Sequence, residues 1–102
     1  MNGEDTRNMY SAVDKVVCPK RSLEILIYLS EHGKSNYTTV EDAVPTSSDI
    51  VTDRLETLQD FGLVEREERS SRNVRYSLTE NGITFLSYLE EIDEFLQDSH
   101  SG

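Results

Sequence analysis

The sequence predicts a mainly α-helical protein that carries one small β-hairpin. Apolar residues recur at the spacing of amphipathic helices along most of the chain, and they alternate clearly with polar residues in a short stretch beyond its middle. With 102 residues, of which 35% are apolar, the chain is large enough for a single domain with one modest core. No internal repeat or low-complexity linker divides it.

The first predicted helix lies near the N-terminus. Its apolar residues fall on one face, and they are Met9, Tyr10, Val13, Val16 and Val17. The spacing corresponds to an amphipathic helix of roughly three turns. Cys18-Pro19 breaks this helix. Pro19 suits the first position of the next helix, because no hydrogen bond from its nitrogen is needed there.

The second predicted helix is mostly buried. Its apolar residues are Leu23, Ile25, Leu26, Ile27 and Leu29. Gly33 closes it as a left-handed cap, and residues 34–37 follow as a short polar stretch that could form an edge strand. Thr38 and Glu41 have the spacing of a capping box, so we expect a short helix there that Pro45 ends.

The next helix is expected to begin at Thr46, since Thr46 and Asp49 repeat the same capping pattern. Its buried residues are Val51, Leu55, Leu58 and Phe61, and Gly62 stops it. Residues 63–69 and 74–78 then alternate as two strands, with a turn-like stretch between them. This pattern predicts a hairpin whose tip carries arginines.

The last predicted helix is capped by Thr79. Its apolar residues step by four, three and four positions, at Phe85, Leu89, Ile92 and Leu96. Such a narrow stripe is typical of a helix that packs lengthwise on another helix. The partner could be the N-terminal helix of the same chain. We expect instead a homodimer formed by both terminal helices, with Val13 contributing from the first.

The predicted order is helix, helix, short helix, helix, hairpin and helix. Two capped helices, separated by a proline-containing turn and followed at once by a hairpin, describe a winged helix-turn-helix. We therefore expect residues 19–79 to form a DNA-binding domain of this type. Residues 1–18 would hold an N-terminal dimerisation helix, and residues 80–102 a C-terminal dimerisation helix and a disordered tail.

Two stretches of the sequence resemble known regulators. VRYSLTENG, from Val74 to Gly82, resembles the second wing strand and following helix start of winged-helix regulators. TDRLETLQDFGLVERE, from Thr52 to Glu67, resembles the recognition helix and first wing strand of the HxlR type, and less closely of the MarR, PadR and ArsR types. The resemblance covers roughly residues 23–89. It implies a homodimer that binds double-stranded operator DNA with recognition helices in major grooves and wings alongside. We expect this regulator to act as a repressor by occupying a promoter.

The chain departs from the HxlR type near its N-terminus. Such chains have an early cysteine and then a longer lead-in helix that contains tryptophan. Here Cys18-Pro19 runs almost directly into the second helix, and the chain has no tryptophan. A thiol-sensing role is therefore not carried over to Cys18. The single cysteine cannot form an internal disulfide, which suits the cytoplasm.

The charge distribution is uneven. The formal net charge is -10, with twenty acidic residues against ten basic ones. Residues 15–21 and 69–76 each carry three cations and no acid, whereas residues 80–102 carry six acids and no lysine or arginine. Lysine is scarce, and the acidic balance resembles that of proteins from salt-accumulating halophiles. An ordinary acidic protein is the competing interpretation.

We expect DNA contacts from ten residues. They are Ser47, Ser48, Thr52 and Arg54 on the helix, Arg69, Arg72 and Arg75 on the hairpin, and Lys20, Arg21 and Lys34 beside the core helices. Hydroxyls and arginines are common donors to phosphates and base edges. Two alternatives stay open: Arg54 could form a structural ion pair, and the hairpin arginines could pair with Glu67, Glu68 and the acidic last helix.

Other functions find little support. His32 and His100 are far apart in the sequence, and no residue spacing matches a metal site. We therefore expect no catalytic residue, no metal and no cofactor, and no effector can be named. The longest apolar run is four residues, which predicts neither a membrane span nor a secretory signal. Because Asp53 places an acid near the expected DNA surface, a protein-interaction module of the transcription machinery is the alternative function.

Overall fold

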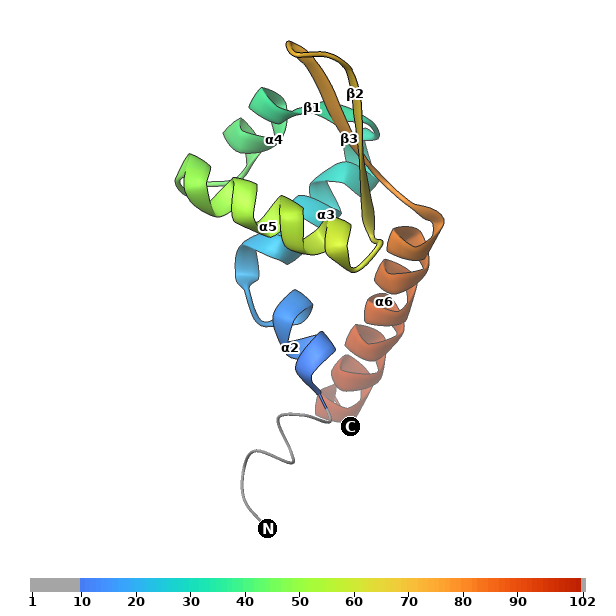
Figure 1. The fold of residues 1–102 in the computed structure, drawn as a ribbon. Helices are drawn as coiled ribbons and strands as arrows, with labels where there is room; N and C mark the ends of the chain where they lie inside the picture. Colours follow the sequence, from blue (N-terminus) through green and yellow to red (C-terminus); the bar gives the residue numbers. More distant parts are fainter. Residues whose placement is uncertain (1–9, 102) are drawn as a thin grey trace.

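The computed structural model describes residues 10–101 and confirms the mainly helical fold with a small sheet. In chain order the elements are α2 (Ser11–Val17), α3 (Lys20–His32), β1 (Ser35–Asn36), α4 (Tyr37–Ala43), α5 (Ser48–Asp60), β2 (Val64–Ser70), β3 (Asn73–Leu78) and α6 (Glu80–Ser101) (Figure 1). α2 is shorter than the three turns expected, and Met9, assigned to it from the sequence, lies outside the described residues.

The sheet has three antiparallel strands in the order β1-β3-β2. β2 and β3 form the expected hairpin, in which Val64 pairs with Leu78 and Glu67 with Arg75. β1 is the edge strand anticipated from residues 34–37, and it places Ser35 opposite Tyr76. The hairpin therefore projects from the helical body as a wing (Figure 1).

The core lies between α3, α5 and the base of the sheet. α3 crosses behind α5 and ends at the strands (Figure 1). Eight of the buried apolar side chains come from α3, α4, α5 and the turn after α4: Ile25, Leu26, Leu29, Val40, Val44, Val51, Leu55 and Leu58. Burial of each such side chain contributes about 1.5–3 kcal/mol. This packing fixes α4 and α5 as a helix-turn-helix on one side of α3.

Three expected helix starts were wrong by one or two residues. Asn36, not Thr38, caps α4, because its extended backbone lets Oδ1 accept a hydrogen bond from the Thr39 N–H at 2.8 Å. Ser47, not Thr46, precedes α5, and it makes no side-chain capping bond. Pro19 is the cap residue before α3 rather than its first helical residue.

Phe61 was expected in the core, but 38% of it is exposed. It lies after the last residue of α5, where the helical path ends and its side chain no longer follows the buried stripe. Gly62 has φ +74°, as expected for a helix-stopping glycine, and Gly33 has φ +76°. The ψ of Gly33 is -160°, so its backbone has a positive φ without being left-handed helical.

Thr79 and Gly82 join the wing to α6. The Thr79 hydroxyl donates to the Gly62 carbonyl at 2.5 Å and accepts from the Gly82 N–H at 3.0 Å, which confirms its capping role. A Cβ at Gly82 would lie 2.2 Å from the Leu63 carbonyl oxygen. Glycine is therefore required there, because α6 starts directly against the turn that follows α5.

α6 extends along the side of the molecule, away from the wing (Figure 1). Leu89 is half-buried, whereas Ile92 and Leu96 of the predicted stripe are 52% and 57% exposed. The helix runs to Ser101 and includes His100, where a frayed tail was expected. No helix within residues 10–101 combines the length and apolar character needed to cross a membrane.

Candidate nucleic-acid interface

Hydroxyl groups from both helices connect the first turn of α5 to α4. Tyr37 donates a hydrogen bond to the Ser48 carbonyl at 3.0 Å, and its oxygen lies 3.0 Å from the Thr52 hydroxyl. The Ser48 hydroxyl donates to Glu41. Ser47, Ser48 and Thr52 are all exposed. The three predicted contact residues therefore share one exposed end of α5, with two of them already oriented by α4.

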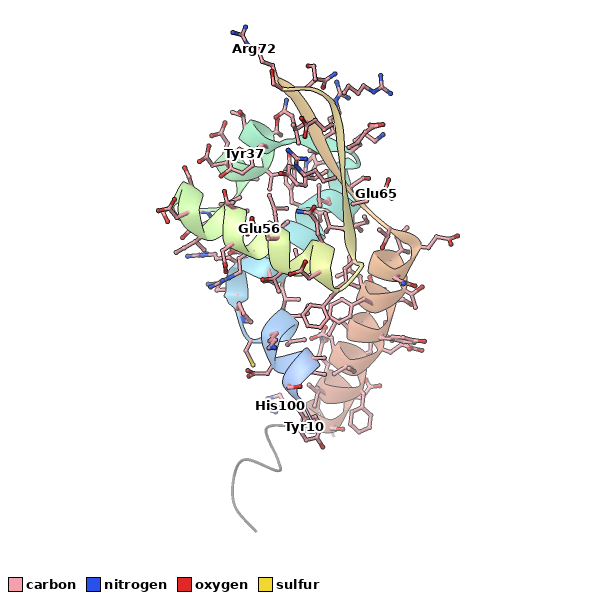
Figure 2. All side chains as sticks on the ribbon, in the orientation of Figure 1. Tyr10, Tyr37, Glu56, Glu65, Arg72 and His100 are labelled. Atoms are coloured by element: carbon pink, nitrogen blue, oxygen red, sulfur yellow. The ribbon has the colours of Figure 1, made fainter. Side chains whose placement is uncertain are left out.

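The outer face of α5 is acidic. Asp49, Asp53, Glu56 and Asp60 are all exposed, and Glu56 points outward in Figure 2. Arg54 is half-buried, and its guanidinium pairs with the neighbouring Asp53. Its Nε is buried and has no hydrogen-bond partner among residues 10–101. This arrangement favours the structural ion pair over base contact for Arg54.

The three wing arginines have different surroundings. Arg72 lies at the tip and points away from the body (Figure 2), and no described residue forms an ion pair or hydrogen bond with its side chain. Arg69 is 69% exposed, with its Nε 3.8 Å from Glu67 Oε2. Arg75 donates from Nε to Asn73 Oδ1 at 3.4 Å. The end of the wing thus carries Arg72, which has no partner among the described residues, and Arg69 and Arg75, whose contacts with their neighbours are long.

The side chain of Lys34 contacts the wing, although the residue precedes β1 in the chain. Its Nζ donates to Glu67 Oε1 at 2.9 Å. The hydrogen bond and charge of Lys34 lower the pKa of Glu67, and Arg69 and Arg75 add to this effect. Both partners are partly exposed, so the pair contributes little to stability. Its importance lies in placing a lysine beside the hairpin.

The other predicted cations lie apart from the wing. Arg21 pairs with Glu24 at 2.6 Å and is half-buried, whereas Lys20 is exposed. Both residues begin α3, and Lys34 follows its end, so the thirteen residues of the helix separate the two groups by about 20 Å. The two basic segments of the sequence do not merge into one surface.

Three residues of the surface were not among the sequence-predicted contacts. Tyr37 ties α4 to α5, and its ring also packs at a tilt on Tyr76, with centroids 6.5 Å apart. Glu67 contacts two cations, and Arg66 pairs with Glu68 at 2.8 Å. Strand alternation placed Glu67 and Arg75 on strands that pair, but their register was needed to make them neighbours.

A second surface lies between α3 and α6. A groove of about 800 Å³ is lined by residues of α3, β3 and α6, among them Leu23, Ile27, Leu78, Leu86, Leu89 and Ile92. Val13 of α2 is 52% exposed. Within the described part of the chain, no group of histidines, cysteines or carboxylates could hold a metal ion. The lining of the groove is mostly apolar, with Glu31, Glu90 and Asp93 among its polar residues.

A helix pair packed on a central helix, followed by the β2–β3 wing, defines a winged helix-turn-helix of the type that transcriptional regulators use. The chain matches the family model of HxlR-like helix-turn-helix proteins over residues 16–101. It therefore belongs to that family, and it is a DNA-binding transcriptional regulator rather than an enzyme. The resemblance stated from the sequence is confirmed.

Solved structures show the same fold. A protein assigned to the MarR family from Enterococcus faecalis is 22% identical, with a TM-score of 0.73 over 100% of this chain and 96% of that chain. The reduced form of the regulator YodB from B. subtilis is 24% identical, with a TM-score of 0.72 over 86% and 87%.

A protein assigned to the HxlR family from Thermoplasma volcanium is 25% identical, with a TM-score of 0.64 over 88% of this chain and 82% of that chain. No curated protein sequence matches the chain. The comparisons thus establish the family and the fold. The DNA-contacting residues are inferred from the geometry described above.

Proposed function

We propose that this regulator is a homodimeric repressor that binds operator DNA sequence-specifically. α5 would enter the major groove, and the wing would lie along the adjacent backbone. The observation that carries the proposal is the exposed guanidinium of Arg72 at the wing tip, which has no partner among the described residues. Arg69 and Arg75 lie on the two strands beside it. A bound dimer would cover a promoter and block transcription.

The exposed hydroxyls of α5 supply the proposed sequence reading. Ser47, Ser48 and Thr52 can bond to base edges or phosphates, and Asp53 can accept from cytosine N4. The acids of α5 repel phosphates over about 10 Å in dilute salt, but over only about 3 Å at molar salt. Concentrated salt would therefore allow an acidic helix to approach DNA closely, while the same salt weakens the attraction between the wing cations and phosphates. Lys20 and Arg21 are proposed to contact phosphates farther along.

The exposed apolar surface supports the homodimer. Ile92 and Leu96 on α6, together with Val13 on α2, would otherwise remain in water at a cost of about 25 cal/mol for each Å². Phe85 and Leu89 continue the stripe toward the core. A second copy would cover the stripe and present two recognition helices to half-sites about one DNA turn apart. The proposal includes no cofactor, and the site of action is the cytoplasm.

The acidic face of α5 favours a second candidate, a module that binds proteins of the transcription machinery without reading DNA sequence. The two functions depend differently on the wing. Replacing Arg69 and Arg72 with alanine should abolish DNA binding by a repressor. The same change should leave partner binding intact in a protein-interaction module.

Recovery and sequencing of bound genomic fragments tests the proposed function. The purified protein would be incubated with genomic DNA of its source in molar potassium chloride and in a low-salt buffer. We expect a small set of promoter fragments to be enriched, and the R69A/R72A variant to recover none. Failure to enrich any fragment in either buffer would favour the protein-interaction module.

A further inference from the structure

One carboxylate of the wing lies among three cations that are expected to contact DNA, namely Lys34, Arg69 and Arg75. Glu67 Oε1 accepts a hydrogen bond from Lys34 Nζ at 2.9 Å, and Oε2 lies 3.8 Å from Arg69 Nε. Arg75 is its partner across the β2–β3 ladder. Cations from three segments, namely the loop before β1, the end of β2 and β3, therefore surround a single acid.

We infer that Glu67 is a phosphate mimic that occupies the wing cations in the free protein and thereby limits how tightly the wing binds DNA; the inference rests on the proposed function. A carboxylate and a phosphodiester both present an anionic pair of oxygens to N–H donors. A DNA phosphate that approaches Lys34 or Arg69 must displace Glu67 or accept its repulsion. Glu67 thus gathers the cations on the wing while weakening their net attraction for DNA.

The position of Glu67 distinguishes it from neighbouring acids. Glu65 lies two residues earlier on the same strand, so both side chains are on the same face. Glu65 is exposed, faces Ser77 across the ladder, and forms no ion pair with a described residue (Figure 2). Glu68 pairs with Arg66. Glu65 is therefore a matched control with the same charge and strand face but without the cation contacts.

The test compares E67Q with E65Q. Each glutamine removes one negative charge at nearly constant size. Binding to a mixed-sequence DNA duplex would be measured by fluorescence anisotropy between about 50 and 200 mM potassium chloride, the range in which phosphate contacts change affinity steeply. Circular dichroism would verify that both variants keep the wild-type fold.

E67Q should bind DNA roughly 3- to 10-fold more tightly than the wild type, as expected for removing one charge about 6 Å from a phosphate in a medium between water and protein surface. E65Q should change the affinity less than about 2-fold, since its charge is farther from the cations and is screened. The log–log salt slope of E67Q should be steeper by about one for each wing in contact with DNA, and so by about two for a bound dimer, because one more phosphate is effectively neutralised at each wing.

A double-mutant cycle tests whether the gain passes through the cations. In a background that carries K34A and R69A, E67Q should gain no more affinity than E65Q does. Persistence of the full gain in that background would overturn the inference, because the effect would then be a general charge effect rather than occupation of these cations.

The remaining outcomes separate the two proposals. If the wild type binds and E67Q behaves like E65Q, the phosphate-mimic role of Glu67 is overturned and the DNA-binding function stands. Binding by E67Q alone, with the wild type and E65Q inactive, supports the inference strongly. If none of the three proteins binds the duplex at any salt concentration, both the inference and the proposed function are overturned.

Discussion

The wing and α6, at two ends of the molecule, have opposite surface character: the wing is rich in cations, whereas α6 is apolar and acidic. The wing collects cations on an acidic protein, with Arg72 unpaired at the tip and Glu67 among its neighbours. α6 collects apolar side chains and carries six acids with no lysine or arginine. Attraction between cations and DNA weakens as salt rises, whereas association of an apolar but acidic helix strengthens as its repulsion is screened.

This contrast explains how a chain of net charge -10 can be a DNA-binding regulator. The net charge is a property of the whole surface, but contact with DNA is made locally. Five of the six carboxylates of α6 belong to residues 90–98, in the half of the helix that leads away from Arg72 to His100 (Figure 2). The wing therefore experiences mainly its own acids.

The largest expected effect is on the proposed homodimer. Replacing Ile92 and Leu96 with alanine removes two exposed apolar side chains from each copy. At about 1.5 kcal/mol for each side chain, the loss is about 6 kcal/mol and weakens dimerisation by roughly four orders of magnitude. Analytical ultracentrifugation measures the change, with E91Q on the same helix as control. A wild-type protein that stays monomeric at high concentration contradicts the α6 interface.

The next effect is on DNA binding. R69A/R72A should weaken binding by at least about 100-fold near 0.1 M salt, which abolishes the recovery of bound fragments, and should reduce the magnitude of the log–log salt slope by roughly 3 to 4, since the proposed dimer loses four arginines that are proposed to contact phosphates. K15Q, which removes an exposed cation of α2, should change binding little. Equal losses in the two variants would show that general charge, rather than the wing, attracts DNA.

The connection between the wing and α6 is expected to be sensitive to the size of the side chain at position 82. G82A places a Cβ against the Leu63 carbonyl oxygen, and α6 or the turn after α5 must shift. Such overpacking should lower the free energy of unfolding by about 2 kcal/mol. Chemical denaturation provides the measurement, and N81A at the exposed neighbouring position serves as control. An unchanged midpoint for G82A would mean that the connection is not tightly packed.

The smallest expected effect is the change in the free energy of unfolding when Ser22, a buried residue of α3, is replaced. Its hydroxyl is fully buried and makes no hydrogen bond within the described structure. S22A removes a polar group without a partner, so it should raise the free energy of unfolding by about 1 kcal/mol. S30A, on the exposed side of the same helix, should have almost no effect. A loss of stability in S22A would indicate that the hydroxyl has a partner in solution.

Local patterns predicted most of the fold. The stripe Val51, Leu55 and Leu58 and the alternation before Leu78 identified α5 and the wing, because burial imposes those periods on the sequence. Helix starts were less predictable, since Asn36 and Ser47 competed with nearby residues of equal capping ability.

The interface was predictable only in part. Arg69, Arg72 and Arg75 stood out as an acid-free segment at a turn, and the structure keeps them on the wing. The pairing of Lys34 with Glu67 joins residues 33 positions apart, and it depends on the strand register. The pairing of Arg54 with Asp53 depends on the rotamer of each side chain. Sequence spacing carries no information about either contact.

The salt dependence of DNA affinity tests the central claim most directly. If the wings of a dimer hold DNA through Arg69, Arg72 and Arg75, these arginines neutralise about six phosphates, and the logarithm of the association constant should fall with the logarithm of salt concentration at a slope of roughly -5, or more steeply where Lys20 and Arg21 also contact phosphates. A duplex that binds with a slope near zero would contradict the account, because cations of the wing would then not be what attracts DNA.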